Sequence, residues 1–160
     1  MTDLARIFID ESRAYLGKTY FSRIERCLES LGDEDVWWRP NEESNSVGNL
    51  VLHLDGSTRM WVVGVAGGSP VERDRQQEFD EREHISRAEL LERLRRTLAA
   101  VDEALARLDA ASLVERRQSP WGEMTALEAV YHAVEHFSMH TGQIITLTKM
   151  RLGVDLKLSD

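Results

Sequence analysis

The sequence contains one cysteine, three prolines and no long uninterrupted run of apolar residues. With Cys27 alone, the chain cannot form an intramolecular disulfide. The longest apolar run, residues 60–66, is interrupted by Gly64 and is far shorter than the roughly 20 residues that span a bilayer, so we expect no membrane segment. Because the amino terminus is acidic where a signal peptide would be basic and then apolar, we expect a cytoplasmic protein.

Positive charge is also scarce. The chain has 20 Lys and Arg residues against 28 Asp and Glu residues, for a formal net charge of -8. Nucleic acids and anionic membranes attract basic surfaces, so this balance argues against both as partners and favours a small-molecule partner. The 160 residues, of which 42% are hydrophobic, suffice for one buried core, and we expect a single domain over residues 1–160.

Apolar residues recur at three- and four-residue spacings in four long segments, which is typical of amphipathic helices. These segments are residues 3–31, 46–66, 86–108 and 125–150. Ser86 with Glu89, and Thr125 with Glu128, have the spacing of a capping box at the start of the third and fourth helices. Because four such helices must bury their apolar faces against one another, we predict an all-α four-helix bundle.

The connections between these helices are less regular. Residues 33–45 are predicted to be a loop that tryptophans anchor, and residues 120–122 a turn. Residues 71–85 are charged and aperiodic, which predicts a long solvated crossover between the second and third helices. Within it, residues 73–79 (RDRQQEF) have two interpretations: they cap the bundle or cover a dimer interface, or arginines such as Arg73 and Arg75 bind an anionic thiol.

Three of the five histidines, His132, His136 and His140, recur at every fourth residue. Two imidazoles four residues apart on a helix can reach one metal ion, whereas three on one straight helix hardly can. On a helical wheel His136 and His140 lie nearer the apolar face than His132. His53, at the edge of the apolar face of the second predicted helix, can supply the third ligand. We therefore predict a metal site of His53, His136 and His140.

Three neutral imidazoles leave a coordination position open, which is typical of a catalytic site. Zinc is the first choice of metal, and nickel, iron and manganese also accept imidazole ligands. The competing interpretation is that a helical His-x3-His pair arises by chance and binds nothing. Candidates for supporting or substrate-contacting roles are Gln143, His132, Ser57, Arg59 and Trp121. His84, in the charged crossover, is expected to be solvated.

The segment EHFSMHTGQI, residues 135–144, resembles the last-helix signature of the DinB-like metal-binding superfamily, and NSVGNLVLHLDG, residues 45–56, resembles its second-helix segment. The resemblance implies an up-down-down-up bundle, usually a homodimer, with a divalent metal on His53, His136 and His140. Characterised relatives include bacillithiol transferases and a mycothiol-dependent maleylpyruvate isomerase. It therefore implies a possible metal-dependent transferase that activates a low-molecular-weight thiol.

The sequence departs from a transferase in one respect, because no thiol-specific pocket and no acid positioned by a motif can be identified in it. Two alternatives therefore stay open. One is a non-enzymatic metal-binding or stress-associated protein, and the other is a dimerising bundle without metal.

Overall fold

The computed structural model describes residues 3–82 and 85–158, and the chain is mostly helical, in agreement with the all-α prediction. Its helices are α1 (Leu4–Ala14), α2 (Phe21–Ser30), α3 (Val47–Thr58), α4 (Arg75–Asp80), α5 (Arg87–Ala106), α6 (Ala110–Leu113) and α7 (Ala126–Leu152). The π-helical segments η1 (Tyr15–Tyr20) and η3 (Arg59–Ala66) continue α1 into α2 and extend α3, and η2 (Asp35–Trp37) is a short 3-10 turn. None of the helices in these described ranges is both long and apolar enough to cross a bilayer.

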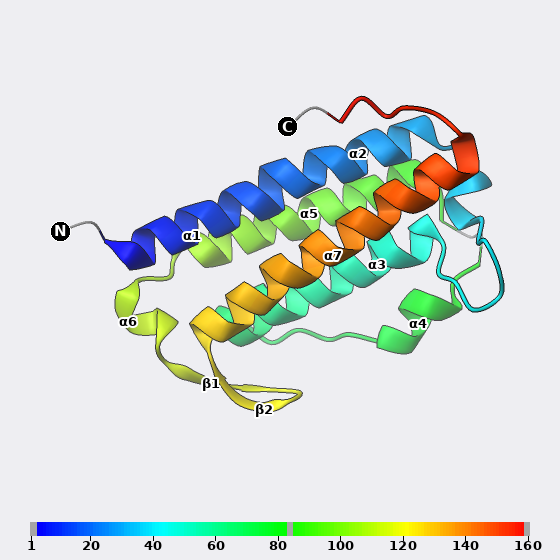
Figure 1. Ribbon diagram of the computed structural model, residues 1–160. Coiled ribbons are helices and arrows are strands. Elements are labelled where there is room, and N and C mark those ends of the chain that lie inside the picture. Colours follow the sequence, from blue (N-terminus) through cyan, green and yellow to red (C-terminus); the bar gives the residue numbers. More distant parts are fainter. Residues whose placement is uncertain (1–2, 83–84, 159–160) are drawn as a thin grey trace.

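The long helical segments lie side by side (Figure 1). The α1–η1–α2 rod packs against α5 and α7, and α3 with η3 packs against the same two helices. In the view of Figure 1, the first rod and α7 run from left to right, whereas α3 and α5 run from right to left. Each of the four segments with helical periodicity is thus found as a helix, within a few residues of the predicted bounds.

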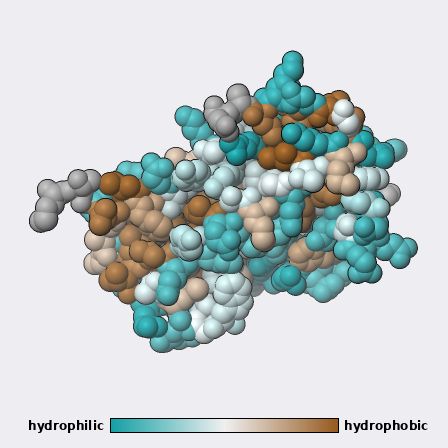
Figure 2. Space-filling model, viewed as in Figure 1, coloured by the Kyte–Doolittle hydropathy of each residue, from teal (hydrophilic) through white to brown (hydrophobic). Residues whose placement is uncertain are grey.

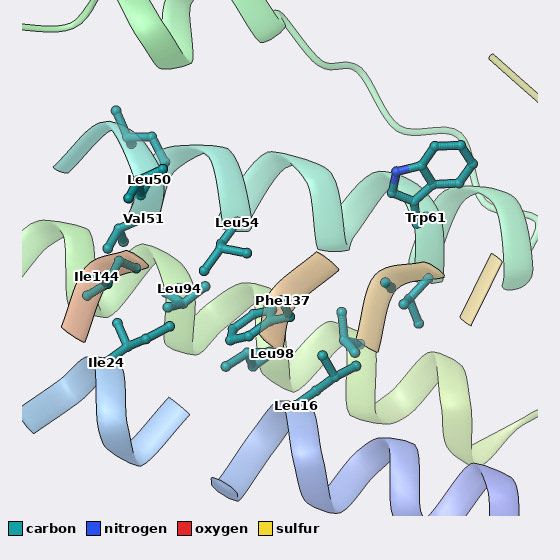
Figure 3. Packing of buried hydrophobic residues seen from close by; sticks show 14 of the residues in the cluster. Leu16, Ile24, Leu50, Val51, Leu54, Trp61, Leu94, Leu98, Phe137 and Ile144 are labelled. Carbon is teal, nitrogen blue, oxygen red and sulfur yellow. The ribbon is translucent and has the colours of Figure 1, made fainter. Parts of the chain in front are cut away.

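Large side chains from all the long helices meet in the core (Figure 3). Leu16, Ile24, Leu94 and Phe137 are all essentially inaccessible to solvent. Burying each such side chain stabilises the fold by about 1.5–3 kcal/mol. Phe137 matters most for the site, because its burial fixes the rotation of α7 and hence the direction of the residues on either side of it.

The helix starts follow from local hydrogen bonds. The hydroxyl of Thr125 accepts the Glu128 N–H, and the Glu128 carboxylate accepts the Thr125 N–H at 2.6 Å, which completes the predicted capping box. At α5 only half of the predicted box is present. Ser86 accepts the Glu89 N–H, but the Glu89 carboxylate pairs with Arg93, one helical turn further on. An exposed carboxylate there gains as much from a guanidinium as from the backbone.

The segment before α7 was predicted to be a turn, but it is a β-hairpin of β1 (Arg116–Ser119) and β2 (Gly122–Thr125). Ser119 pairs with Gly122 at its tip, and Gly122 has a φ of 102°, which favours glycine. The strands are mostly polar and exposed. They therefore lack the alternation of apolar and polar residues that reveals a strand in a sequence.

The crossover was predicted to be a solvated loop, and this is wrong for its middle part. Residues Arg75–Asp80 form α4, which Asp74 caps by accepting the Gln76 and Gln77 N–H groups. The helix packs along α3 and buries Glu78 to 8% exposure. A helix of six residues is not stable by itself, so it forms because of its tertiary contacts. The local sequence has no helical periodicity that would predict it.

The contact of Trp37 with Gly48 can be used to test how the loop of residues 33–45 is anchored. A Cβ atom at Gly48 would lie 2.7 Å from a ring carbon of Trp37, whose indole N–H donates to the Ile85 carbonyl. We expect Gly48→Ala to lower the free energy of unfolding by about 1–3 kcal/mol, because the ring must shift. Urea denaturation measures this change.

The matched control is Gly142→Ala in α7, where a Cβ atom would meet nothing within 4 Å. Here we expect a gain of about 0.5–1 kcal/mol, because alanine is the better helix former. Equal effects of the two substitutions would contradict the clamping role of Trp37.

Candidate metal centre

Three imidazole nitrogens meet between α3 and α7. The Nε2 atom of His136 lies 3.1 Å from Nε2 of His53 and 3.1 Å from Nε2 of His140. All three ligand atoms lie within 4.8 Å of one another. Zinc–nitrogen bonds of about 2.0–2.1 Å would separate two ligand nitrogens by about 3.3 Å in a tetrahedral and about 2.9 Å in a right-angled arrangement. The geometry is therefore that of a group that could hold a metal ion.

Partners on the far side of two rings set their tautomers. Nδ1 of His53 lies 2.9 Å from Oε2 of Glu78, and Nδ1 of His140 lies 2.7 Å from Oε1 of Gln143. Nη2 of Arg73 also lies 3.1 Å from Nδ1 of His53, but it donates to Glu78 at the shorter distance of 2.7 Å, so the carboxylate decides the tautomer of His53. Since both oxygens can only accept, each Nδ1 carries the proton and each Nε2 presents a lone pair. Both lone pairs face the His136 nitrogen. A proton on Nε2 of His136 could be donated well to only one of these two lone pairs. A cation at the same place can interact with both.

A buried ion pair holds the carboxylate that orients His53. Arg73 donates from Nε to Oε1 of Glu78 at 2.6 Å and from Nη2 to Oε2 at 2.7 Å. Both side chains are about nine-tenths buried. Burial alone would raise the pKa of Glu78, but the hydrogen bonds from Arg73 and His53 outweigh it and lower the pKa. Glu78 is therefore ionised at neutral pH and keeps the proton of His53 on Nδ1.

Gly56 makes room for this ion pair. It lies three residues after His53 on α3, on the same side of the helix. A Cβ atom there would lie 2.1 Å from Oε1 of Glu78 and 3.0 Å from Nε of Arg73. Only glycine therefore lets the carboxylate approach the helix closely enough to reach the imidazole.

The site favours neutral imidazoles. Burial, together with the charges of His140, His53, His132 and Arg73, lowers the pKa of His136 to about 3. Burial also lowers the pKa of His140, against the opposing hydrogen bond with Gln143. Because a histidine must be deprotonated to bind a metal ion, both rings are in the ligand form at pH 7.

A cavity of about 410 Å³ opens beside two of the three histidines, His53 and His136. Its walls come from α3 and η3, the crossover, the hairpin and α7, and they include Ser57, Trp61, Trp121 and His132. The rings of Trp61, Trp121 and His132 pack on one another at centroid distances of 4.5 to 4.9 Å. A small molecule in this cavity would therefore lie between an aromatic wall and the imidazole nitrogens.

Comparison with known proteins identifies the family of this chain. The family model of the DinB superfamily matches residues 18–144. The chain belongs to the DinB superfamily. A conserved protein from Enterococcus faecalis has a similar structure, with a TM-score of 0.75 at 15% identity over 96% of this chain and 100% of the other. A DinB-like protein from Bacillus cereus has a TM-score of 0.70 at 17% identity over 92% and 93%. No curated protein matches the sequence.

The other candidate residues of this DinB superfamily member are distributed around the centre. His132 lies on the cavity wall, with its ring 5.3 Å from that of His136, and burial lowers its pKa. Ser57 is buried on the same wall, and Trp121, although 67% exposed, closes it from the hairpin. Gln143 contacts His140. Arg59 is exposed and borders a different cavity of about 260 Å³.

Sequence reasoning missed Glu78, because nothing in the charged crossover distinguishes it from its exposed neighbours. Arg73 was considered as a ligand for an anion or as part of a segment that caps the bundle or covers a dimer interface, and the structure pairs it with Glu78. The one available signal was Gly56, a glycine inside a helix at a three-residue spacing from a predicted ligand. His84 lies outside the described residues.

The lowered histidine pKa values predict how the metal-stripped protein responds to acid. Below the ordinary histidine pKa of 6.5 the unfolded chain binds more protons than the folded one, because the pKa values of His132, His136 and His140 are lowered by folding. The free energy of unfolding therefore falls as the pH drops from 6.5. The ordinary pKa of Glu78 is 4.5 and the fold lowers it. Its contribution to the free energy of unfolding is therefore lost only as the pH falls below about 4.5.

Denaturant unfolding between pH 7 and pH 5 measures this dependence, and His136→Gln removes the most strongly shifted group. The variant should lose less stability than the parent protein over that interval. Identical pH dependences of the two proteins would show that His136 is not held neutral by the fold.

Proposed function

We propose that the chain is a divalent-metal-dependent enzyme of the DinB-like type, with the ion held by His53, His136 and His140. The convergence of three Nε2 atoms next to a cavity carries this proposal. Within the described ranges, the ligand group contains these three histidines and no carboxylate or thiol. At least one coordination position would therefore face the cavity. Zinc is the first choice, and nickel, iron and manganese also suit imidazole ligands.

We infer that the reaction is transfer of a low-molecular-weight thiol to an electrophile. The thiol loses its proton, its sulfur forms a bond to the electrophilic carbon, and the leaving group departs with the electron pair of the broken bond. A bound divalent ion would lower the pKa of the thiol so that the thiolate forms near neutral pH. The chain itself contributes an aromatic wall that excludes water and His132, a neutral base on the same wall that can accept the proton.

We further infer the up-down-down-up bundle topology, a cytoplasmic location and a homodimer. Apolar side chains support the dimer, because they gather at the end of the molecule where α1 begins beside α6 and the start of α7 (Figure 2). Leu4, Ile7, Val114 and Leu127 are 39% to 78% exposed there. A second copy would remove this surface from water.

The metal proposal predicts a specific pattern among histidine variants. The purified, untagged protein should bind about one Zn²⁺ per chain, and His140→Ala should weaken binding by at least about a hundredfold, because it removes a ligand rather than a supporting contact. His132→Ala should keep the affinity within about threefold, since its ring lies on the wall. Competition with a chromogenic chelator measures these affinities.

Gly56→Ala is the informative intermediate case. It leaves all three ligands in place but displaces Glu78, so we expect a loss of affinity of about 10- to 100-fold. Equal affinity in the parent protein and His140→Ala would refute the three-histidine site. Loss of metal in His132→Ala as well would mean that the ligand set has been assigned wrongly.

The transferase proposal predicts metal-dependent conjugation. Protein loaded in turn with zinc, nickel, iron and manganese should join bacillithiol, mycothiol or glutathione to an aryl halide, as measured by mass spectrometry of the product. Trp61→Ala should reduce turnover by about tenfold or more without loss of metal, because the ring borders the reacting groups. Silence across this panel in the metal-loaded protein would contradict the transferase and leave the non-enzymatic metal-binding role.

A further inference from the structure

Arg75 is a positive charge on the wall of the cavity, and it has no ion-pair partner among residues 3–82 and 85–158. Its guanidinium carbon lies 5.0 Å from the centre of the Phe79 ring, and the side chain borders the cavity beside His53 and His136. In the part of the chain that the structure describes, no carboxylate lies within ion-pair distance of Arg75. Its planar group therefore has its hydrogen-bond donors free for another partner.

The contrast with Arg73 shows which arginine is available. Arg73 also borders the cavity, but Nε and Nη2 of its guanidinium donate to Glu78 at 2.6 and 2.7 Å. Its charge is cancelled by a buried carboxylate, and it cannot turn towards a ligand without leaving that carboxylate unpaired. Arg75 is exposed and has no such carboxylate partner among the described residues.

The position of Arg75 sets the size of a ligand that would reach the histidines. The ring of Phe79 is near both side chains, with its centre 4.9 Å from that of His53 and 5.0 Å from the guanidinium carbon of Arg75. The guanidinium carbon of Arg75 is therefore no more than about 10 Å from the centre of the His53 ring. A molecule of a few bonds in length can contact both, and larger ligands would extend out of the cavity.

The rest of the wall favours a flat apolar body. Trp61 is 2% exposed and Trp121 is 67% exposed, so one indole forms the floor of the aromatic wall and the other its open edge. Planar apolar groups pack well on indole rings. The cavity thus joins a hydrophobic surface to a single unpaired cation.

We propose that this cavity binds a small ligand in which an anionic oxygen group, bound by Arg75, is joined to a flat apolar body that packs against Trp121. The inference rests on the proposed function, since this ligand would be the substrate presented to the metal centre. It names the substrate class as an aryl or similarly flat carboxylate or phosphonate. A guanidinium binds either head group with two parallel hydrogen bonds.

Binding of phenylacetate to the full-length, zinc-loaded protein tests this proposal. Phenylacetamide serves as the neutral probe of the same shape, and acetate as the probe without a ring. Indole N–H resonances of Trp61 and Trp121 report occupancy of the cavity itself. We expect saturable binding of phenylacetate, weaker binding of phenylacetamide by about three- to tenfold, and no measurable shift with acetate.

Arg75→Gln should weaken phenylacetate binding by the same three- to tenfold factor and leave phenylacetamide unchanged, whereas Arg75→Lys should restore part of the affinity. Arg59→Gln is the matched control, because it removes an equal exposed charge that borders the other cavity. Equal effects of Arg75→Gln and Arg59→Gln on phenylacetate binding would overturn the proposal. So would equal affinity of the parent protein for phenylacetate and phenylacetamide.

The same titrations on metal-stripped protein separate this proposal from the metal centre. Phenylacetate affinity that persists without metal and still depends on Arg75 supports the proposal even if the metal assignment fails. Binding that is abolished by metal removal and insensitive to Arg75→Gln places the carboxylate on the ion, and this refutes the role of Arg75. Metal content, measured for each variant, should not change in Arg75→Gln.

Discussion

The buried contact of Arg73, Glu78 and His53 is the interaction on which the site depends. Removing an ionised carboxylate from water is unfavourable, and here a two-pronged guanidinium and an imidazole N–H offset that penalty. The carboxylate in turn decides which nitrogen of His53 carries the proton. It also stabilises α4, because Glu78 connects that six-residue helix to α3. One ion pair therefore links the fold of the crossover to the chemistry of the centre.

The other half of the centre depends on the core. Phe137 lies between His136 and His140 in the sequence and is fully buried. The packing that fixes its ring therefore also fixes the direction of both imidazoles. The His136 and His140 nitrogens then meet because they are one helical turn apart. The ligands on α7 are consequently as well ordered as the core itself, and rigid placement of this kind is what a metal or catalytic site requires.

The cavity combines features that no single element supplies. The hairpin contributes Trp121, η3 contributes Trp61, whose ring packs on that of Trp121, and the crossover contributes Arg75. Trp61 belongs to a π-helical segment, a geometry that often occurs at functional sites because it redirects side chains. Connecting segments thus supply part of the cavity wall, while the long helices hold the histidines.

Several features could be predicted from the sequence because they depend on residues close together along the chain. The period of apolar residues located the long helices, the Thr125–Glu128 pair located the start of α7, and the four-residue spacing placed two histidines on one side of it. The same reasoning predicted a full capping box at Ser86, and half of it is wrong, since Glu89 has a competing partner in Arg93. It also missed the hairpin, whose strands are polar on both sides.

What only the tertiary structure decided are the contacts between distant residues. His53 meets His136 across 83 positions, and it meets Glu78 across 25. A helical wheel gives the direction of a side chain around its own axis, but not which helix lies opposite or at what height. The acid that orients His53 was therefore hidden in a charged segment without periodicity, and the sequence did not show which arginine of that segment pairs with it. The role of Glu78 comes from burial, and burial is a property of the packed chain and not of its local sequence.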